Sequence, residues 1–218
     1  MLGTKAAALI GLALVGGQAM AQTKSVWSVK AGYNHFFPQA KSGDVTGVPG
    51  GTVDVGDGGG AFVSAAYMFS DNVSAELGFG IPPKLDIEGR GTIAQAGKIA
   101  DAKVVSPILV LQYRFRRADA VLRPYVGLGA TYTWYNSVNT TPILSTLTNP
   151  GGVTTATIDN AWGAVAQIGA KYKLNKHWFV DGSIGPTRIK TTARLSTGQS
   201  VDVKVDPLLV NLAVGYRF

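Results

Sequence analysis

The chain has two histidines, His35 and His177, and no cysteine. A catalytic triad needs a nucleophile and an acid within hydrogen-bond reach of a histidine. Neither histidine has a serine or an acid at a spacing that suggests such a triad. Two distant histidines without a thiolate also make a poor ligand set for zinc. We therefore predict no enzymatic activity, no catalytic residue, no metal site and no cofactor.

Charged side chains are the second group that could carry chemistry, because several fall on the same face of the strands described below. They are Lys30, Glu76, Arg114, Lys171, Lys173, Asp181 and Arg217. Unpaired buried charges are costly, so we expect the two acids to pair with bases and the set to form a charged plug. The alternative is a set of solvated charges at strand ends with no organised network.

The first residues carry the pattern of an export signal. Lys5 precedes a small and apolar run over 6–17, and Ala19-Met20-Ala21 supplies the small residues that a signal peptidase recognises. The apolar run is shorter than the roughly 20 residues of a spanning helix. We predict a signal peptide over 1–21, which is removed, and a single domain over 22–218.

The last strand shows the pattern that organises the mature chain. Alternate positions from Leu208 to Phe218 are all apolar, whereas the other face includes Asn211, Gly215 and Arg217. This period of two indicates a strand with one uniformly apolar face. The same asymmetry predicts seven more strands, near 25–37, 59–69, 72–81, 103–115, 123–135, 160–174 and 177–193. The strand near 177–193 loses its alternation at Gly185-Pro186, which predicts a bulge.

The predicted fold class is all-β, an eight-stranded antiparallel transmembrane β-barrel in an outer membrane. The strand number is even, and short connections alternate with longer segments rich in Gly and Thr. We expect both termini on the periplasmic side and external loops at 38–58, 82–101, 136–158 and 194–200. Aromatic residues at strand ends predict interface girdles that contact outer-membrane lipid. They are Trp27, Tyr67, Phe69, Tyr113, Phe115, Trp134, Tyr135, Tyr172, Trp178, Tyr216 and Phe218.

The formal net charge of +7 raises the question of a nucleic-acid partner. The Lys and Arg residues are scattered rather than clustered, and an exported protein rarely meets DNA. We predict no nucleic-acid partner. The sequence does not determine the oligomeric state, and a monomer is the working expectation.

Four segments of the chain resemble the OmpW/AlkL family of small outer-membrane proteins. They are Pro107–Phe115, Arg123–Gly129, Asp159–Gly163 with Gln167–Gly169, and Val205–Leu208 with Gly215–Phe218. The resemblance implies an eight-stranded barrel that passes small hydrophobic molecules across the outer membrane. It also implies an apolar funnel at the outer end and a sideways exit into the bilayer. The segments 38–58 and 136–158 match nothing that we can assign.

Apolar residues on the inward face are candidates for that funnel. Phe36, Phe62, Ile108 and Leu209 fall near the outer end, with Tyr125 and Val165 toward mid-height. One interpretation is a hydrophobic binding funnel. The other is plain packing, which any narrow barrel of eight strands needs. The sequence supports the two equally.

Prolines near the outer parts of the third and fourth strands are candidates for a lateral gate. A proline has no N–H to donate to the ladder, so Pro82, Pro83 and Pro107 could weaken the pairing between these strands. For Pro82 and Pro83 we favour the simpler interpretation that they end a strand. Pro107 stays open.

A structural, adhesive or receptor-type barrel is the alternative function. Its long external segments 38–58 and 136–158 would bind other surfaces, and their Gly and Thr content is typical of mobile loops. The identity of any solute is not determined by the sequence.

Overall fold

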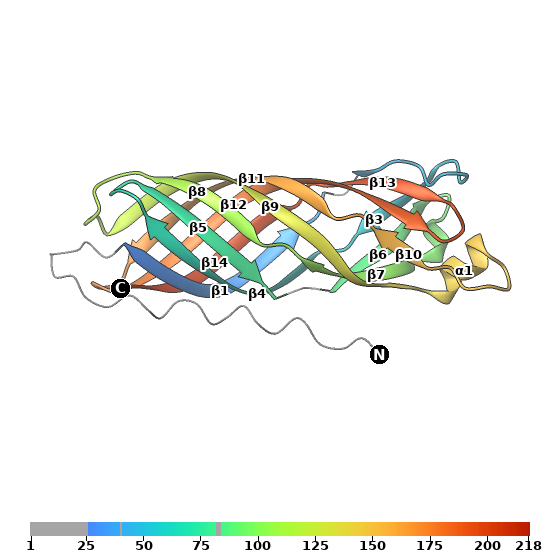
Figure 1. Cartoon of the computed structure of the whole chain (residues 1–218), viewed down its shortest axis with the longest axis horizontal. Coiled ribbons are helices and arrows are strands. Elements are labelled where there is room, and N and C mark those ends of the chain that lie inside the picture. Colours follow the sequence, from blue (N-terminus) through green and yellow to red (C-terminus); the bar gives the residue numbers. More distant parts are fainter. Residues whose placement is uncertain (1–25, 40, 82–83) are drawn as a thin grey trace.

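The computed structural model describes residues 26–39, 41–81 and 84–218, so the predicted signal peptide over 1–21 lies outside the described residues. These residues form a closed antiparallel β-barrel of eight wall strands, which confirms the predicted fold class (Figure 1). The wall strands are β1 (Trp27–Phe37), β4 (Gly58–Met68), β5 (Val73–Gly80), β8 (Ile108–Arg114), β9 (Leu122–Thr140), β11 (Ala161–Lys173), β12 (Trp178–Leu195) and β14 (Leu208–Arg217).

The first and last wall strands close the barrel. β1 pairs with β14 from Ser28 opposite Arg217 to Phe37 opposite Leu208, and with β4 on its other side. An open sheet edge in a bilayer would leave backbone N–H and C=O groups without partners. Closure removes that edge, so the long alternating strands of this chain are stable in lipid only as a ring.

The two ends of the barrel differ in their connections. Short turns join β4 to β5, β8 to β9 and β11 to β12 at one end, where the C-terminus also lies (Figure 1). We call it the turn end. At the opposite end β9 and β12 continue beyond the barrel wall, and we call it the extended end.

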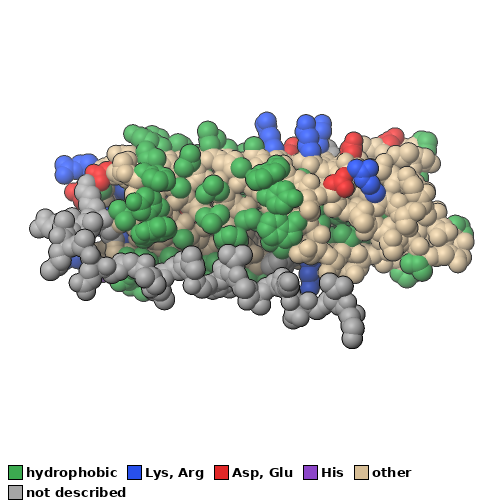
Figure 2. All heavy atoms as spheres, viewed as in Figure 1, with side chains coloured by type: hydrophobic (Ala, Val, Ile, Leu, Met, Phe, Trp, Pro, Cys, Tyr) green, Lys and Arg blue, Asp and Glu red, His purple; other side chains and the backbone are tan. Residues whose placement is uncertain are grey.

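Outward and inward residues alternate along the wall as predicted. The outward side chains of Leu128 and Trp162 are each 72% exposed, whereas the inward Thr131 and Thr133 are almost completely buried. Figure 2 shows apolar side chains spread over the surface on the turn-end side, with charged groups at the turn end and over the extended half. This is the surface pattern of a barrel whose outer face meets lipid.

Aromatic rings gather at two levels. At the turn end, Trp27 contacts Tyr67 with ring centroids 4.9 Å apart, and Trp178 contacts Tyr216 at 5.2 Å. Toward the extended end, Tyr132 lies 4.9 Å from Trp162. The placement of Tyr135 in a girdle was wrong, because it follows Trp134 on the strand and its side chain therefore points to the interior.

The extended end contains two small sheets where the sequence predicted loops. The additional strands are β2 (Lys41–Ser42), β3 (Gly51–Val55), β6 (Lys84–Gly91), β7 (Lys98–Val105), β10 (Ala156–Ile158) and β13 (Ser200–Val205). β3, β6 and β7 pair in that order and join the end of β9, while β10 and β13 pair with the end of β12, and β2 pairs with β13. The loop prediction for 38–58, 82–101, 136–158 and 194–200 was therefore wrong where these strands and a short helix lie, whereas 43–50 and 196–199 lie outside these elements.

A compact hydrophobic cluster explains why these segments fold. Its buried members are Val53, Ala96, Ile99, Leu144, Val201 and Val203. Leu144 comes from α1 (Pro142–Thr148), and Ala96 from the 3-10 turn η1 (Ala94–Ala96). Thr141 caps α1 by accepting a hydrogen bond from the backbone N–H of Leu144, and Pro142 occupies the first turn. No helix among the described residues is long and apolar enough to cross a membrane.

The predicted bulge at Gly185-Pro186 is absent, because β12 is one strand with an unchanged pairing register to β14 and β11. Gly185 is required by close packing, since a Cβ there would collide with the Ala166 carbonyl oxygen. The outward face stays in phase but changes in chemistry, from Ile184 and Pro186 to Arg188. The sequence pattern therefore marks the point where the strand leaves lipid, not a shift of phase.

Candidate functional site

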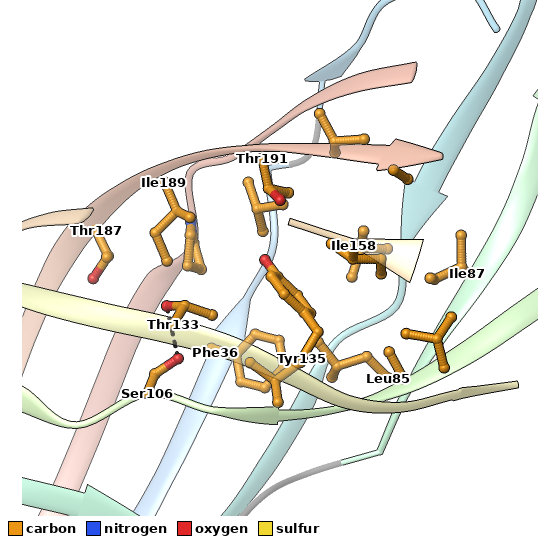
Figure 3. Close-up of a pocket in the computed structure, with 18 of the residues that line it drawn as sticks. Phe36, Leu85, Ile87, Ser106, Thr133, Tyr135, Ile158, Thr187, Ile189 and Thr191 are labelled. Atoms are coloured by element: carbon orange, nitrogen blue, oxygen red, sulfur yellow. Dashed lines mark hydrogen bonds between the residues drawn. The ribbon is translucent and has the colours of Figure 1, made fainter. Parts of the chain in front are cut away.

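A cavity of about 400 Å³ occupies the extended half of the barrel. Its lining is mostly apolar and comes from wall strands and from the additional sheets. Four of the predicted funnel residues line it, namely Phe36, Phe62, Ile108 and Leu209. Val165 is buried in the wall but does not line this cavity, and Tyr125 lies lower, in the charged cluster described below. Figure 3 shows side chains from several strands converging on this space.

Much of the lining was missed by sequence reasoning. Leu85, Ile87, Ile158 and Ile189 line the cavity, and the Tyr135 ring points into the same space as Phe36 (Figure 3). Val201, Val203 and Val205 also contribute. These three valines alternate with charged residues, which is a period-two signal that could have revealed β13.

A small number of hydroxyl groups interrupt the apolar lining. Ser106 Oγ donates to Thr133 Oγ1 at 2.8 Å (Figure 3). Thr187 and Thr191 of β12 line the same cavity, and the Thr187 hydroxyl is buried with no hydrogen-bond partner among the described residues. The site therefore combines a large apolar surface with a few polar groups, as small-molecule pockets generally do.

The barrel wall has a window in its hydrogen-bond ladder. β5 and β8 pair as far as Gly78 opposite Ile108. Beyond this point β5 is followed by β6 and β8 is preceded by β7, and the first pair between β6 and β7 is Lys84 opposite Lys103. No strand pair joins 79–81 to 104–107 among the described residues. Pro107 lies at this window, and its carbonyl accepts a hydrogen bond from Thr131 Oγ1 at 2.8 Å. Pro82 and Pro83 lie outside the described residues.

Residues of the outward face line the cavity at the window. Phe79 and Ile81 belong to the outward face, with 48% and 64% of their surface exposed, and they also line the cavity. Gly80, between them, lines it as well. The cavity therefore borders the barrel wall at the window.

A charged cluster closes the cavity toward the turn end. Lys30 Nζ lies 2.6 Å from Asp181 Oδ1 and 3.0 Å from Glu76 Oε1, and all three side chains are largely buried. The Tyr125 hydroxyl donates to the same Asp181 oxygen at 3.0 Å. Glu76 also accepts from Ser64 Oγ and from Gln112 Nε2, each at 2.9 Å. Buried charges are thus paired and hydrogen-bonded, which is the arrangement that makes their burial tolerable.

The remaining predicted plug residues lie nearer the turn end. Arg114 donates to Gln112 Oε1 at 2.9 Å, and Lys171 Nζ lies 3.7 Å from the centre of the Phe179 ring. Lys173 is only half-buried and donates to the Asp119 carbonyl at 2.8 Å. Arg217, one residue from the C-terminus, lines the mouth of the turn end. In the described part of the chain, Lys30 is thus the cation that bridges the two acids of the interior.

The two histidines are placed far from this interior cluster. His35 Nε2 lies 3.2 Å from Asp57 Oδ2 near the extended end. His177 Nδ1 lies 3.1 Å from the Arg217 carbonyl, and its ring stacks on Tyr216 at the turn end. Among the described residues there is no group of three side chains that could hold a metal ion.

The closed barrel, its apolar outer face and its interior cavity define a small outer-membrane β-barrel. The chain belongs to the OmpW family, whose model matches residues 25–218. It is 35% identical over 163 residues to outer membrane protein W of Vibrio cholerae, covering 72% of each chain. It is 30% identical over 176 residues to a "dibenzothiophene metabolism operon protein", PahQ, of Pseudomonas aeruginosa, covering 78% of this chain and 77% of PahQ.

The fold is also similar to a solved structure of the family. The crystal structure of the outer membrane protein OprG from Pseudomonas aeruginosa superposes with a TM-score of 0.81 at 25% identity, covering 89% of this chain and 96% of OprG. The resemblance recognised in the sequence is confirmed, and the barrel lies in the outer membrane.

Proposed function

We propose that this barrel passes small hydrophobic molecules across the outer membrane. The observation that carries the proposal is that the residues lining the apolar cavity include Phe79, Gly80 and Ile81, at the window between β5 and β8. In the proposed orientation, the extended end faces outward and the turn end, with both termini, faces the periplasm. Short turns on the periplasmic side and longer external segments are the usual asymmetry of such barrels.

The proposed route runs from the extended end into the cavity and then sideways into the bilayer. Removing apolar surface from water favours entry, at about 25 cal/mol for each Å². The Lys30, Glu76 and Asp181 cluster disfavours onward passage through the lumen, because a hydrophobic solute cannot replace its ion pairs. The window offers the solute an apolar exit at Phe79 and Ile81.

Two further observations support transport over the adhesive alternative. The segments 38–58 and 136–158, on which that alternative depended, contribute Val45, Val53 and Leu144 to the cavity lining. The name of the relative PahQ connects it with dibenzothiophene metabolism, and dibenzothiophene is a small hydrophobic molecule. Both points are consistent with a hydrophobic solute.

The first test fills the cavity. Leu209→Trp places an indole in the cavity, whereas Leu208→Trp, one residue earlier on the same strand, adds the same ring to the outward face. We expect naphthalene uptake by cells with Leu209→Trp to fall to the level of cells lacking the gene. Leu208→Trp should transport normally. Equal uptake in cells with and without the gene would contradict the proposal.

The second test narrows the window. A Cβ at Gly80 would meet only ordinary van der Waals contacts, with the nearest atom at 3.5 Å, so a side chain can start from this position without a backbone clash, and Gly80→Leu adds bulk there. We expect purified Gly80→Leu protein to bind naphthalene while uptake by cells falls. The control is Ala61→Leu, which adds the same bulk to the exposed face of β4. Normal uptake with Gly80→Leu would contradict the proposed lateral exit. It would not contradict the cavity as the binding site.

A further inference from the structure

A second pocket, of about 200 Å³, opens at the turn end, on the other side of the Lys30 cluster from the apolar cavity. Its lining is strongly basic. The basic and imidazole side chains are Arg114, Arg123, Lys171, Lys173, Lys176, His177 and Arg217. Asp71 is the one acid that lines this pocket in the described part of the chain. The aromatic residues Trp27, Phe69 and Trp178 also line this pocket.

Two of these basic residues are buried and incompletely hydrogen-bonded. Arg114 is 4% exposed and Arg123 is 7% exposed. Arg114 donates through Nη2 to Gln112, and Arg123 donates through Nη2 to the carbonyls of Asp71 and Arg116. The Nε atoms of both guanidinium groups are buried with no hydrogen-bond partner among the residues described. Such buried donors are rare and call for a missing acceptor.

No carboxylate of the described residues forms a salt bridge with Arg114, Arg123 or Lys171. All 13 acidic residues lie in the described ranges, and the two acids of the interior, Glu76 and Asp181, are both bound to Lys30. Arg114, Arg123 and Lys171 form no salt bridge with any described residue, whereas Asp71 and Arg217 have interactions of their own. Arginine keeps its proton at all physiological pH values. Positive charge without a salt-bridge partner thus remains on the buried side chains of Arg114 and Arg123, where it is costly.

We propose that this pocket binds a phosphate group. Guanidinium groups match the oxygens of phosphate geometrically and can donate to it in pairs. Arg114 and Arg123 would donate from the barrel interior, and the Lys171 ammonium, held over the Phe179 ring, would supply a third positive charge. A pocket of this size accepts a phosphate-sized group but not the bulk of a lipid.

Two sources share this chemistry, namely free phosphate and the headgroup of an inner-leaflet phospholipid. The aromatic rings that border the pocket are those of the turn-end girdle, where headgroups lie. The site is separate from the solute route. Only the compartment of its ligand rests on the orientation proposed above, so binding can be tested whether or not the barrel transports a solute.

The test observes the arginine Nε–H groups directly. Mature protein in dodecyl maltoside micelles, which carry no phosphate group, is titrated with inorganic phosphate at constant ionic strength set by chloride, and its arginine side-chain signals are followed by NMR. We expect saturable downfield shifts of the Arg114 and Arg123 Nε–H signals. No saturable shift with phosphate or with phosphatidylglycerol, or an equal response to chloride alone, would overturn the proposal.

Lipid composition separates the two sources. Dodecyl maltoside micelles doped with phosphatidylglycerol should produce the same shifts without added phosphate if the headgroup is the ligand. If free phosphate is the ligand, phosphatidylglycerol should leave the signals unchanged. Either pattern supports a phosphate site.

Variants test which residues bind. Arg123→Gln should raise the dissociation constant for phosphate about tenfold or more, because it removes charge-assisted hydrogen bonds. Lys171→Met keeps the aliphatic stem over Phe179 and removes only the charge. It is the variant for the same binding test if Arg123→Gln does not fold. Lys103→Gln removes an exposed lysine near the extended end and should bind phosphate normally. Wild-type affinity in both pocket variants would refute the site.

Discussion

The two halves of the barrel interior are built on the same inward face of the same strands but have opposite contents. Toward the turn end, Lys30, Glu76, Asp181 and Tyr125 fill the lumen with ion pairs and hydrogen bonds. Toward the extended end, the same face lines an apolar cavity of about 400 Å³. Alternation along a strand decides only which face a residue occupies.

The difference between the halves teaches what each can do. A satisfied charged cluster is rigid and excludes apolar molecules, because any displaced ion pair leaves a buried charge. An apolar cavity offers water few partners and is a favourable place for an apolar molecule. Substitutions should therefore cost stability in the first half and transport in the second.

The largest expected effect is in the charged half. Lys30→Met leaves Glu76 and Asp181 buried without their cation, and we expect the free energy of unfolding to fall by about 3–5 kcal/mol. Urea unfolding in lipid vesicles, followed by tryptophan fluorescence, measures this. Lys103→Met, at an exposed lysine, is the matched control and should change stability by less than about 0.5 kcal/mol. An effect of similar size in the control would contradict the importance of the cluster.

A smaller effect is expected when one neutral partner is removed. Tyr125→Phe keeps the ring but deletes the hydroxyl that donates to Asp181. The loss should be about 2 kcal/mol, typical of a hydrogen bond to a charged group, and naphthalene uptake should be unchanged. Reduced uptake with unchanged stability would instead place Tyr125 in the solute path, as the sequence suggested.

In the apolar half we expect the reverse. Ile108→Ala enlarges a cavity that already exists, so few packing contacts are lost, and the cost should be about 1 kcal/mol rather than the 2–5 kcal/mol usual in a packed core. Naphthalene binding should change measurably. The same unfolding assay and a binding titration check both quantities, and a large loss of stability would mean that Ile108 is ordinary packing.

The smallest effect concerns pH and the sheet at the extended end. The Asn139 amide, which donates at 3.0 Å, and the ammonium groups of Lys84 and Lys98 hold the pKa of Asp101 below its usual 3.8. Stability from a lowered carboxyl pKa is present above the usual value and lost as pH falls through the folded-state value. Amide exchange in β6 and β7, corrected for intrinsic rates, should accelerate below about pH 4. Asp101→Asn should remove this acceleration.

Much of the wall could be predicted from sequence because lipid imposes uniformity on one face of every strand. The run from Leu208 to Phe218 has one possible outward face, and the closed ring follows from it. The extended end was missed because 38–58 and 136–158 are rich in Gly and Thr and their strands are short, so the turn signals dominated. Their folding depends on a cluster such as Val53 with Val201, which forms only between distant segments.

The sequence also did not provide the position of each inward residue along the barrel axis. Tyr125 has the correct parity for the funnel, but it lies near the start of β9, where the register brings it to Asp181. The window could be predicted in part from the sequence, because Pro107 has no backbone N–H to donate to the strand ladder. Its extent depends on the register of four strands, which no local pattern specifies.

The central claim is that apolar solute occupies the extended half and meets lipid at the window. Nuclear Overhauser contacts between naphthalene and methyl-labelled protein in lipid nanodiscs test it most directly. The account predicts contacts to methyl groups of Ile108, Ile189 and Leu209 in the cavity and of Ile81 at the window. Contacts confined to lipid-facing methyl groups such as those of Val180 and Val214, with none in the cavity, would contradict it.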